Sequence, residues 1–412
     1  MKKLFLILLI TILSTCFAGE FYYGGFWKNY ATATFIPDYF QDMTGYGQAT
    51  GILNQTYRLN LSYSPLDFAS VNASYELMAK VYDPDFDLPN FGFTESQQGA
   101  YRAFDLDNTI YPAPDFPEKS NLSILGNLDR AYIRLSWKAD LYIGRQPIAW
   151  GTARMVKPCE VIVPYSYDAL DTEERPGVDA IRLRMPIGMM SEIDMGYISG
   201  DEFEIEKSAI FGRGKFYALE TDFSLLAVKY KKSMLYGFDM MRSIGGTGTW
   251  LEAAYSDIEV DSSQIGDIEQ DIFRLSAGAD YSFSDKFYGW AEYHYNSAGK
   301  TFDEEYRAIL NDPAYRSGEL YLLGQHYLIP GASYSINPLL SASSVIYYNI
   351  VDGSALIVPS LEYNIAEDIY IAFGGYLGLG EPLENESGIF PKINSEFGSY
   401  TDMVYASFRI YY

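Results

Sequence analysis

The chain has 412 residues, of which 48% are hydrophobic, 17% aromatic and 20% charged. A disordered or low-complexity chain would be poor in aromatic residues and rich in charge, so this composition excludes one. The 30 basic and 54 acidic residues give a net charge of −24, which argues against general nucleic-acid binding. Two Cys and two His are too few for a disulfide framework or a Cys/His zinc cluster, and no cofactor is expected.

The first 18 residues have the pattern of a secretory signal peptide. Residues 2 and 3 are lysines, residues 4–12 are an apolar stretch, and Cys16-Phe17-Ala18 is a small-x-small exit. We predict cleavage after Ala18, which leaves residues 19–412 as the mature chain. The alternative is a lipoprotein signal with an acylated Cys16, but the Thr before it fits that pattern poorly. After cleavage, Cys159 is the single thiol and has no partner for an internal disulfide.

Apolar and polar residues alternate with a period of two along the rest of the chain. From Val71 to Val81, one face carries Val, Ala, Tyr and Leu, while the other carries Asn, Ser, Glu, Met and Lys. Similar alternation recurs at 57–63, 273–281 and 357–365. It is typical of a strand with one apolar and one polar face. No stretch is convincing as a helix, and no later run approaches the ~20 apolar residues of a transmembrane helix.

The predicted links between strands alternate between short and long. Turn-forming residues occupy short links near 64–67, 138–140, 186–189, 245–248, 284–285, 337–338 and 366–368. Most of the other links are longer and more polar, at 36–47, 83–125, 150–176, 259–269, 298–320 and 380–398. Short periplasmic turns and long extracellular loops are typical of a transmembrane antiparallel β-barrel. We predict an all-β barrel of about 18 strands, with 16 as the alternative.

A soluble β-sandwich or propeller is the alternative fold. Three features argue against a soluble fold. The outward faces of the strands are apolar, there is no propeller repeat, and the last strand runs to the last residue. In that strand, Phe408, Ile410 and Tyr412 share one face. This ending resembles the C-terminal signal read by the barrel-insertion machinery of bacterial outer membranes. We therefore predict a bacterial outer-membrane protein surrounded by lipid, with its oligomeric state, a homotrimer included, left open.

Residues 126–199 carry two motifs of a known group of proteins. They read GRQPIAWG at 144–151 and EERPGVDAIRL at 173–183. These runs resemble a group of porin-like outer-membrane proteins and are similar to the alginate-export barrels. The resemblance implies a porin-like barrel but no particular solute. A barrel of 16 to 18 strands with a polar interior would enclose an aqueous pore, so we predict a channel for small hydrophilic solutes and not an enzyme. Family members usually carry N-P-x-D-L between the two runs, whereas this chain has KPCEV at 157–161, so different pore-facing chemistry is expected there.

Charged residues concentrate on the lumenal faces of the same region. The predicted pore wall consists of Arg130, Tyr132, Arg134, Arg145, Arg182, Arg184, Glu192 and Asp194. Strict alternation from Ile143 would direct Arg145 toward lipid, so we expect a bulge at Gly144 or a position near the membrane interface. A three-residue turn at 187–189 would place Arg184 opposite Glu192 and Arg182 opposite Asp194, as cross-strand ion pairs. Such a structural role is compatible with a role in a constriction.

The third outward loop, 152–176, is acidic. Its carboxylates are Glu160, Asp168, Asp171, Glu173 and Glu174. Our hypothesis is that this loop folds toward the basic wall and forms a constriction with a transverse field. The acidic loops would favour cations and the arginines would favour anions locally, and we lean toward cations.

Other candidate sites are weaker. Asp83, Asp85 and Asp87 form a D-x-D-x-D run that could bind calcium, but Thr94 stands where an EF-hand needs a Glu. A solvated acidic loop is the default interpretation, and no metal is predicted. We interpret His294 as a hydrogen-bonded wall residue, since two His leave no visible Ser-His-Asp set. Besides a diffusion channel, a polysaccharide export conduit and a barrel-type hydrolase remain as alternative functions.

Overall fold

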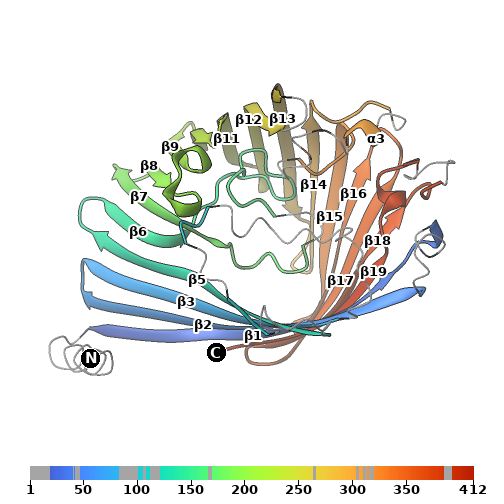
Figure 1. Ribbon diagram of the computed structural model, residues 1–412, viewed down its shortest axis with the longest axis horizontal. Coiled ribbons are helices and arrows are strands. Elements are labelled where there is room, and N and C mark those ends of the chain that lie inside the picture. Colours follow the sequence, from blue (N-terminus) through green and yellow to red (C-terminus); the bar gives the residue numbers. More distant parts are fainter. Residues whose placement is uncertain are drawn as a thin grey trace.

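The computed structural model describes residues 19–39, 41, 47–82, 101–104, 108–111, 121–165, 169–262, 266–302, 306–309, 312, 315, 320–384 and 392–412. Eighteen antiparallel strands of this part of the chain form one closed barrel (Figure 1). The predicted fold class and strand number are confirmed. The signal peptide at 1–18, the calcium candidates Asp83, Asp85 and Asp87, and the loop residue Asp168 lie outside the described residues.

The wall strands follow one another around the ring in chain order. They are β1 (Glu20–Phe35), β2 (Ala49–Leu66), β3 (Ala69–Val81), β5 (Leu122–Ser136), β6 (Asp140–Pro147), β7 (Gly177–Ile187), β8 (Ser191–Ile198), β9 (Ala209–Ala218), β10 (Thr221–Tyr230), β11 (Ser233–Ile244), β12 (Thr247–Ser262), β13 (Gly266–Ser282), β14 (Phe287–Asn296), β15 (His326–Asn337), β16 (Leu340–Asn349), β17 (Ala355–Ala366), β18 (Ile369–Leu379) and β19 (Met403–Tyr411). A further short strand, β4 (Asn108–Tyr111), pairs with β5.

The first and last strands close the ring. β1 and β19 are antiparallel, with Trp27 opposite Ile410 and Asn29 opposite Phe408. The rings of Trp27 and Phe408 meet edge to face, with centroids 6.2 Å apart. The apolar face predicted at the C-terminus therefore contributes to the outer surface at the seam of the barrel.

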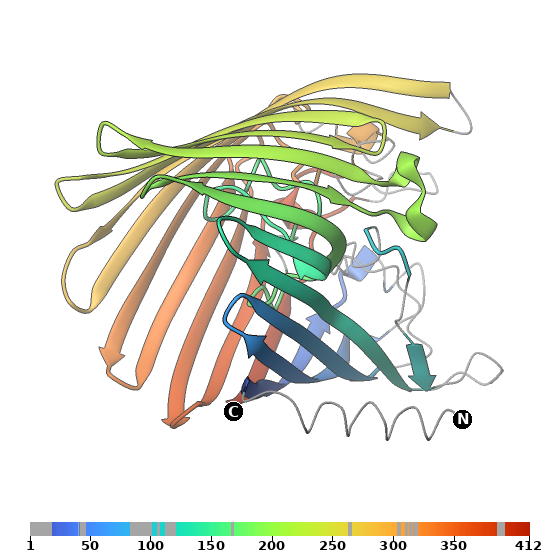
Figure 2. The ribbon, with the colours of Figure 1, turned by 90° about the vertical axis from the view of Figure 1, so that its left-hand side faces the viewer.

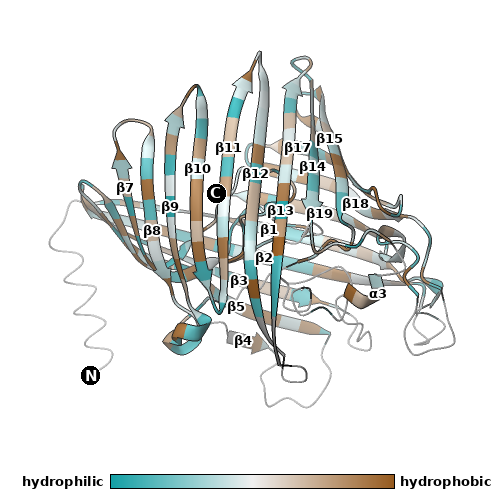
Figure 3. Cartoon of the chain, turned by 90° about the horizontal axis from the view of Figure 1, so that it is seen from above, coloured by the Kyte–Doolittle hydropathy of each residue, from teal (hydrophilic) through white to brown (hydrophobic). Residues whose placement is uncertain are grey.

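The alternation of residues along the strands separates the two surfaces of the barrel. Residues such as Val71, Tyr75 and Phe373 are exposed on the outer surface, whereas Ser256, Ser276 and the carboxylates of neighbouring strands are buried on the inner one. Figure 3 shows the alternating hydrophobic and hydrophilic bands along individual strands. A pleated strand directs successive side chains to opposite faces, so this pattern requires an apolar exterior and a largely polar interior.

The connections also separate into two sets. Links of a few residues gather at one end of the barrel, here called the turn end, and the long links gather at the other, the loop end (Figure 2). The loops contain short helices: η1 (Asp201–Phe203), η2 (Ile205–Lys207), α3 (Tyr306–Ile309) and η4 (Phe397–Ser399). In the described residues, no helix has the length and apolar character needed to cross a membrane.

Candidate functional site: a loop that crosses the lumen

The loop between β6 and β7, residues 148–176, lies inside the ring of strands (Figure 1, green). Its first half bonds to β12, β13 and β14. Its second half bonds to β1, β2 and β5. In the order of strands around the ring, these two groups stand on opposite sides. The loop, called the crossing loop below, therefore spans the lumen from the far wall (β12–β14) to the near wall (β1, β2 and β5).

Apolar packing supports the first part of the crossing loop. Trp150 is buried against Phe211 of β9, with ring centroids 4.8 Å apart. Leu226 and Val228 of β10 and Leu235 of β11 point into the same buried cluster. These three side chains face the lumen although they are apolar, because the loop covers them. Alternation alone gives no means of assigning their face.

Two buried carboxylates of the far wall bind the backbone of the crossing loop. Glu252 of β12 accepts hydrogen bonds from the backbone N–H groups of Thr152, Ala153 and Cys159, at 2.7–2.8 Å. Glu292 of β14 accepts hydrogen bonds from the N–H groups of residues 154–156, the shortest at 2.8 Å. Neither glutamate was singled out as a site residue in the sequence. The signal in the sequence that could have indicated their role is that each Glu occupies an inward-facing position in the middle of a strand.

Basic residues of the near wall bind the acidic end of the crossing loop. The Lys28 ammonium of β1 lies 2.8 Å from Asp171 and 2.7 Å from Glu173. Arg130 of β5 lies 2.6 Å from Glu174. The hydroxyl of Tyr411 donates a hydrogen bond to Glu173 at 2.7 Å. Arg130 of the predicted pore wall therefore meets the acidic loop, whereas Lys28 and Tyr411 were not among the predicted wall residues.

We call the ion pairs of Lys28 and Arg130 with Asp171, Glu173 and Glu174 the near-wall contact. Its opposite charges touch one another and do not face each other across an aperture. The Lys28 side chain has no exposed surface, whereas those of Asp171 and Glu173 are 35% and 46% exposed. Burial acts to raise the pKa of Glu173, but hydrogen bonds from Lys28 and Tyr411 outweigh it and hold that pKa below its ordinary value. Glu173 accordingly presents an ionised carboxylate to the lumen.

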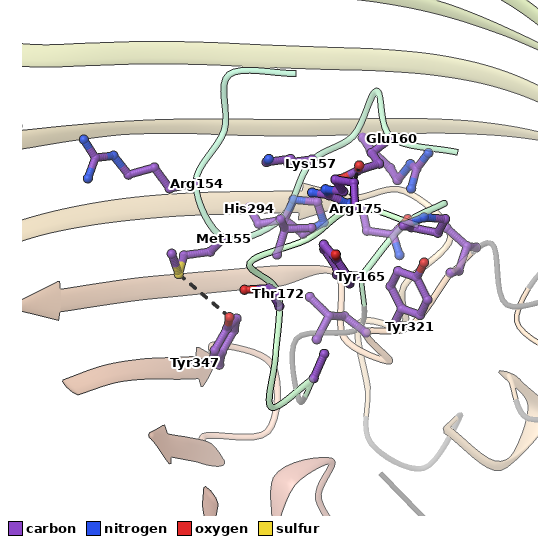
Figure 4. A pocket seen from close by; sticks show the side chains of 17 residues that line it. Arg154, Met155, Lys157, Glu160, Tyr165, Thr172, Arg175, His294, Tyr321 and Tyr347 are labelled. Atoms are coloured by element: carbon purple, nitrogen blue, oxygen red, sulfur yellow. Dashed lines mark hydrogen bonds and ion pairs between the residues drawn. The ribbon is translucent and has the colours of Figure 1, made fainter. Parts of the chain in front are cut away.

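Glu160 lies at the edge of a cavity of about 320 Å³ between the crossing loop and the walls of β13, β14 and β16 (Figure 4). Its carboxylate is 2.5 Å from the Arg175 guanidinium. Burial raises the pKa of Glu160 to about 7, although Arg175 and Lys157 act in the opposite direction. Figure 4 shows Lys157, Arg175 and Glu160 from the loop close to His294 from the wall.

The remaining predicted pore-wall residues form a network on β5–β8. The ion pairs are Arg134–Asp140 at 2.9 Å, Arg182–Asp194 at 2.6 Å and Arg184–Glu192 at 2.8 Å, and Tyr132 packs near Tyr142. The expected pairs of β7 and β8 are formed, but the expected register is wrong. Arg184 stands opposite Asp194 and Arg182 opposite Gly196, because β7 continues through Ile187 and β8 begins at Ser191. Both ion pairs are therefore diagonal.

Arg145 differs from its predicted place in the pore wall. It stands opposite Ala131 and Asp179, in the register of the outward-facing Ile143 and Ile181. Its guanidinium bonds to the Asp179 carboxylate at 2.9 Å and 3.1 Å and to the backbone carbonyls of Leu128 and Phe104.

The expected bulge at Gly144 is also absent, since β6 keeps its register there with both neighbouring strands. The other expectation, a position near the membrane interface, stays a prediction. Arg145 lies two residues before the end of β6, where residues 101–104 reach the wall and complete its set of hydrogen-bond acceptors.

His294 is buried on the inner wall and forms a hydrogen bond between its Nδ1 and the Ser276 hydroxyl, at 2.8 Å. Ser276 donates its own proton to the carbonyl of Val156 at 2.7 Å. His294 is then the donor to Ser276 and not its base, so this pair lacks the arrangement of a hydrolase nucleophile. No group of three or more metal-ligating side chains occurs among the described residues.

Comparison with known proteins identifies the architecture. No protein-family model and no curated protein matches the chain. OccAB1 of Acinetobacter baumannii has a TM-score of 0.59 at 9% identity, with 97% of this chain and 98% of that one covered. OccK8 (OprE) of Pseudomonas aeruginosa has a TM-score of 0.54 at 8% identity, with 95% and 98% covered. A BenF-like porin from Pseudomonas fluorescens Pf-5 has a TM-score of 0.53 at 8% identity, with 95% and 98% covered. At these identities, the similarity shows a common barrel fold.

Proposed function

We propose that the protein is an outer-membrane, porin-like channel for the passive diffusion of small hydrophilic solutes, and that it is not an enzyme. The observation that carries the proposal is a closed 18-strand ring with an apolar exterior and a charged interior. A barrel of this size encloses an aqueous lumen, whereas one of about eight strands is filled by its own side chains. Inner-wall side chains such as Arg134 and Arg184 keep 44% and 37% of their surface exposed, which agrees with a wet lumen.

Two observations favour this function over the alternatives. The crossing loop is tied to both walls, which suits the passage of small solutes better than that of a polysaccharide chain. The bonding of Ser276 to a backbone carbonyl argues against a hydrolase site at the buried His294. One of the solved structures of similar fold is named a porin, which agrees with the proposal.

The proposed pore wall consists of Arg130, Tyr132, Arg134, Arg182, Arg184, Glu192 and Asp194. The proposed constriction is the near-wall contact of Asp171, Glu173 and Glu174. The apolar C-terminal face at Phe408, Ile410 and Tyr412 would serve as the signal for the insertion machinery. These roles in transport and in membrane insertion are inferred from where the residues lie in the barrel.

Single-channel recording tests the proposal. The mature chain, residues 19–412, would be refolded and inserted into a planar bilayer, and conductance would be measured in a series of salt concentrations. Discrete current steps that increase with salt are expected for an open aqueous pore. A correctly refolded barrel without conductance would overturn the function. Arg134→Ala should change ion selectivity if Arg134 faces the ion path.

A further inference from the structure

We propose that Glu252 and Glu292 are positioning residues that hold the crossing loop against the far wall and thereby set the bore of the channel. The part of the inference that concerns the bore rests on the proposed function. The part that concerns the loop rests on hydrogen bonds alone. The two parts are separated by the experiment below.

The two glutamates use their oxygens on the loop and not on the wall. Both side chains are fully buried, and each accepts hydrogen bonds from three successive or nearby backbone N–H groups of residues 152–159. The indole N–H of Trp250 donates a further bond to Glu292 at 2.8 Å. Over the part of the chain that the structure describes, neither carboxylate has a Lys or Arg within ion-pair distance. By contrast, the wall carboxylate Asp194 pairs with Arg182 of the neighbouring strand β7, and Glu362 of β17 pairs with Arg409 of β19, two strands away.

This arrangement makes the loop backbone the partner of two buried charges. An ionised carboxylate only accepts hydrogen bonds, and burial without donors would cost several kcal/mol. The six loop N–H groups supply those donors. Conversely, lumenal loop N–H groups without an acceptor would also be penalised. Loop and wall therefore satisfy each other, and moving the loop away would expose both sets of groups at once.

Neighbouring groups extend the same attachment. Ser276 donates to the Val156 carbonyl at 2.7 Å, and Arg274 donates to the Pro158 carbonyl at 2.8 Å. Between them, β12, β13 and β14 bind six N–H groups and two C=O groups of residues 152–159. Such pairing of irregular backbone with wall side chains is what allows a loop to lie inside a barrel without a sheet of its own.

Gly151 explains why the loop can approach so closely. Its φ of +97° is in the left-handed region that favours glycine, and a Cβ there would lie 2.6 Å from both carboxylate oxygens of Glu252. The W-G ending of the GRQPIAWG motif is therefore accounted for by packing. Trp150 anchors on Phe211, and Gly151 admits the Glu252 carboxylate.

Cys159 provides a native reporter of the attachment. Its side chain has no exposed surface, its N–H donates to Glu252, and its thiol lies beneath the loop against β12. Burial raises the pKa of the Cys159 thiol well above its ordinary value, which further slows its reaction. It is the only thiol of residues 19–412, so labelling with a charged maleimide measures release of the loop in the folded barrel.

The experiment compares wild type, Glu252→Gln, Glu292→Gln and the matched control Glu362→Gln. Glutamine keeps the shape of the side chain but replaces one acceptor oxygen with a donor. We expect Cys159 labelling to accelerate at least roughly tenfold in the two anchor variants, because each loses bonds to a charged group. Single-channel conductance should rise in the same variants. Glu362 of β17 pairs with Arg409 of β19, outside the strands β12–β14 that hold residues 152–159, so Glu362→Gln should leave labelling of Cys159 unchanged.

Each outcome decides one part of the inference. Unchanged labelling in both anchor variants would overturn the anchoring, as would a wild-type thiol that reacts as fast in the folded barrel as in urea. Faster labelling with unchanged conductance would overturn the effect on the bore. A wild type without conductance would overturn the proposed function, while the labelling would still decide the anchoring. If Glu252→Gln does not give a barrel with heat-modifiable mobility, Glu292→Gln decides in its place.

Discussion

The ion pair between Arg145 and Asp179 gives the sharpest test of the structure. Arg145 stands in outward register, yet its side chain is only 4% exposed. Its acceptors are the Asp179 carboxylate and two backbone carbonyls, those of Leu128 and Phe104. Asp179 in turn accepts a hydrogen bond from the N–H of Ala103 at 2.9 Å. The pair therefore joins the barrel wall to the segment at 101–104.

The expected cost of breaking this pair follows from the burial of Arg145. Asp179→Ala removes the only carboxylate in contact with the guanidinium among the described residues and leaves a buried positive charge with two neutral acceptors. Removal of one partner of a buried ion pair costs about 3–5 kcal/mol. Replacing both residues together, as Arg145→Met with Asp179→Leu, should cost much less than the sum of the single changes, because no unpaired charge remains.

The measurement is the free energy of unfolding in urea for the barrel refolded into detergent micelles or vesicles. Arg134–Asp140 is the matched control, because it is also an Arg–Asp pair at 2.9 Å but is 44% and 29% exposed. Asp140→Ala should cost no more than about 1 kcal/mol. If Asp179→Ala destabilises the barrel no more than Asp140→Ala does, the reasoning from burial is refuted.

Two further predictions concern charged groups of the loops. Burial raises the pKa of Glu396 from 4.5 to about 7, so its neutral form is favoured in the folded loop. Protection of residues 392–402 from hydrogen exchange should therefore be greatest at or below about pH 4.5 and fall as the pH rises to about 7, by up to about 3 kcal/mol. Glu396→Gln should remove this dependence, and a persisting slope would contradict the assignment. Lys28→Met leaves Asp171 and Glu173 without their cation, so the reversal potential in a salt gradient should shift toward cation selectivity. An unchanged potential would show that the near-wall contact lies outside the ion path.

The architecture was predictable because it depends on a repeated pattern. Alternation along the strands, turn residues at one end and long polar links at the other are each present many times, so errors at single positions do not change the fold. The pairing of Arg182 with Asp194 was also accessible, since both residues lie close to one tight turn. Its register was not, because the turn lies one residue later than the sequence suggested.

The features of the site that escaped prediction depend on contacts between segments far apart in the chain. Glu252 looks like an ordinary inward polar residue until a loop about 100 residues earlier in the chain is placed against it. The inward face of Leu226 and Val228 could not be assigned for the same reason, since the loop that covers them comes from elsewhere in the chain. The sequence marked the outward register of Arg145 as anomalous. The contact that satisfies its guanidinium there, with the segment at 101–104, could not be predicted, because no local pattern connects that segment to β6.

The crossing loop has a mechanical consequence for the barrel. A ring of strands held only by hydrogen bonds between neighbours can flatten into an ellipse without breaking those bonds. A tie between opposite sides removes this soft mode of deformation, since flattening must stretch the bonds at Glu252 and Glu292 or those at Lys28 and Arg130. The loop thus acts as a strut across the diameter, so changes in lateral pressure from the surrounding lipid are resisted across the width of the ring as well as along its circumference.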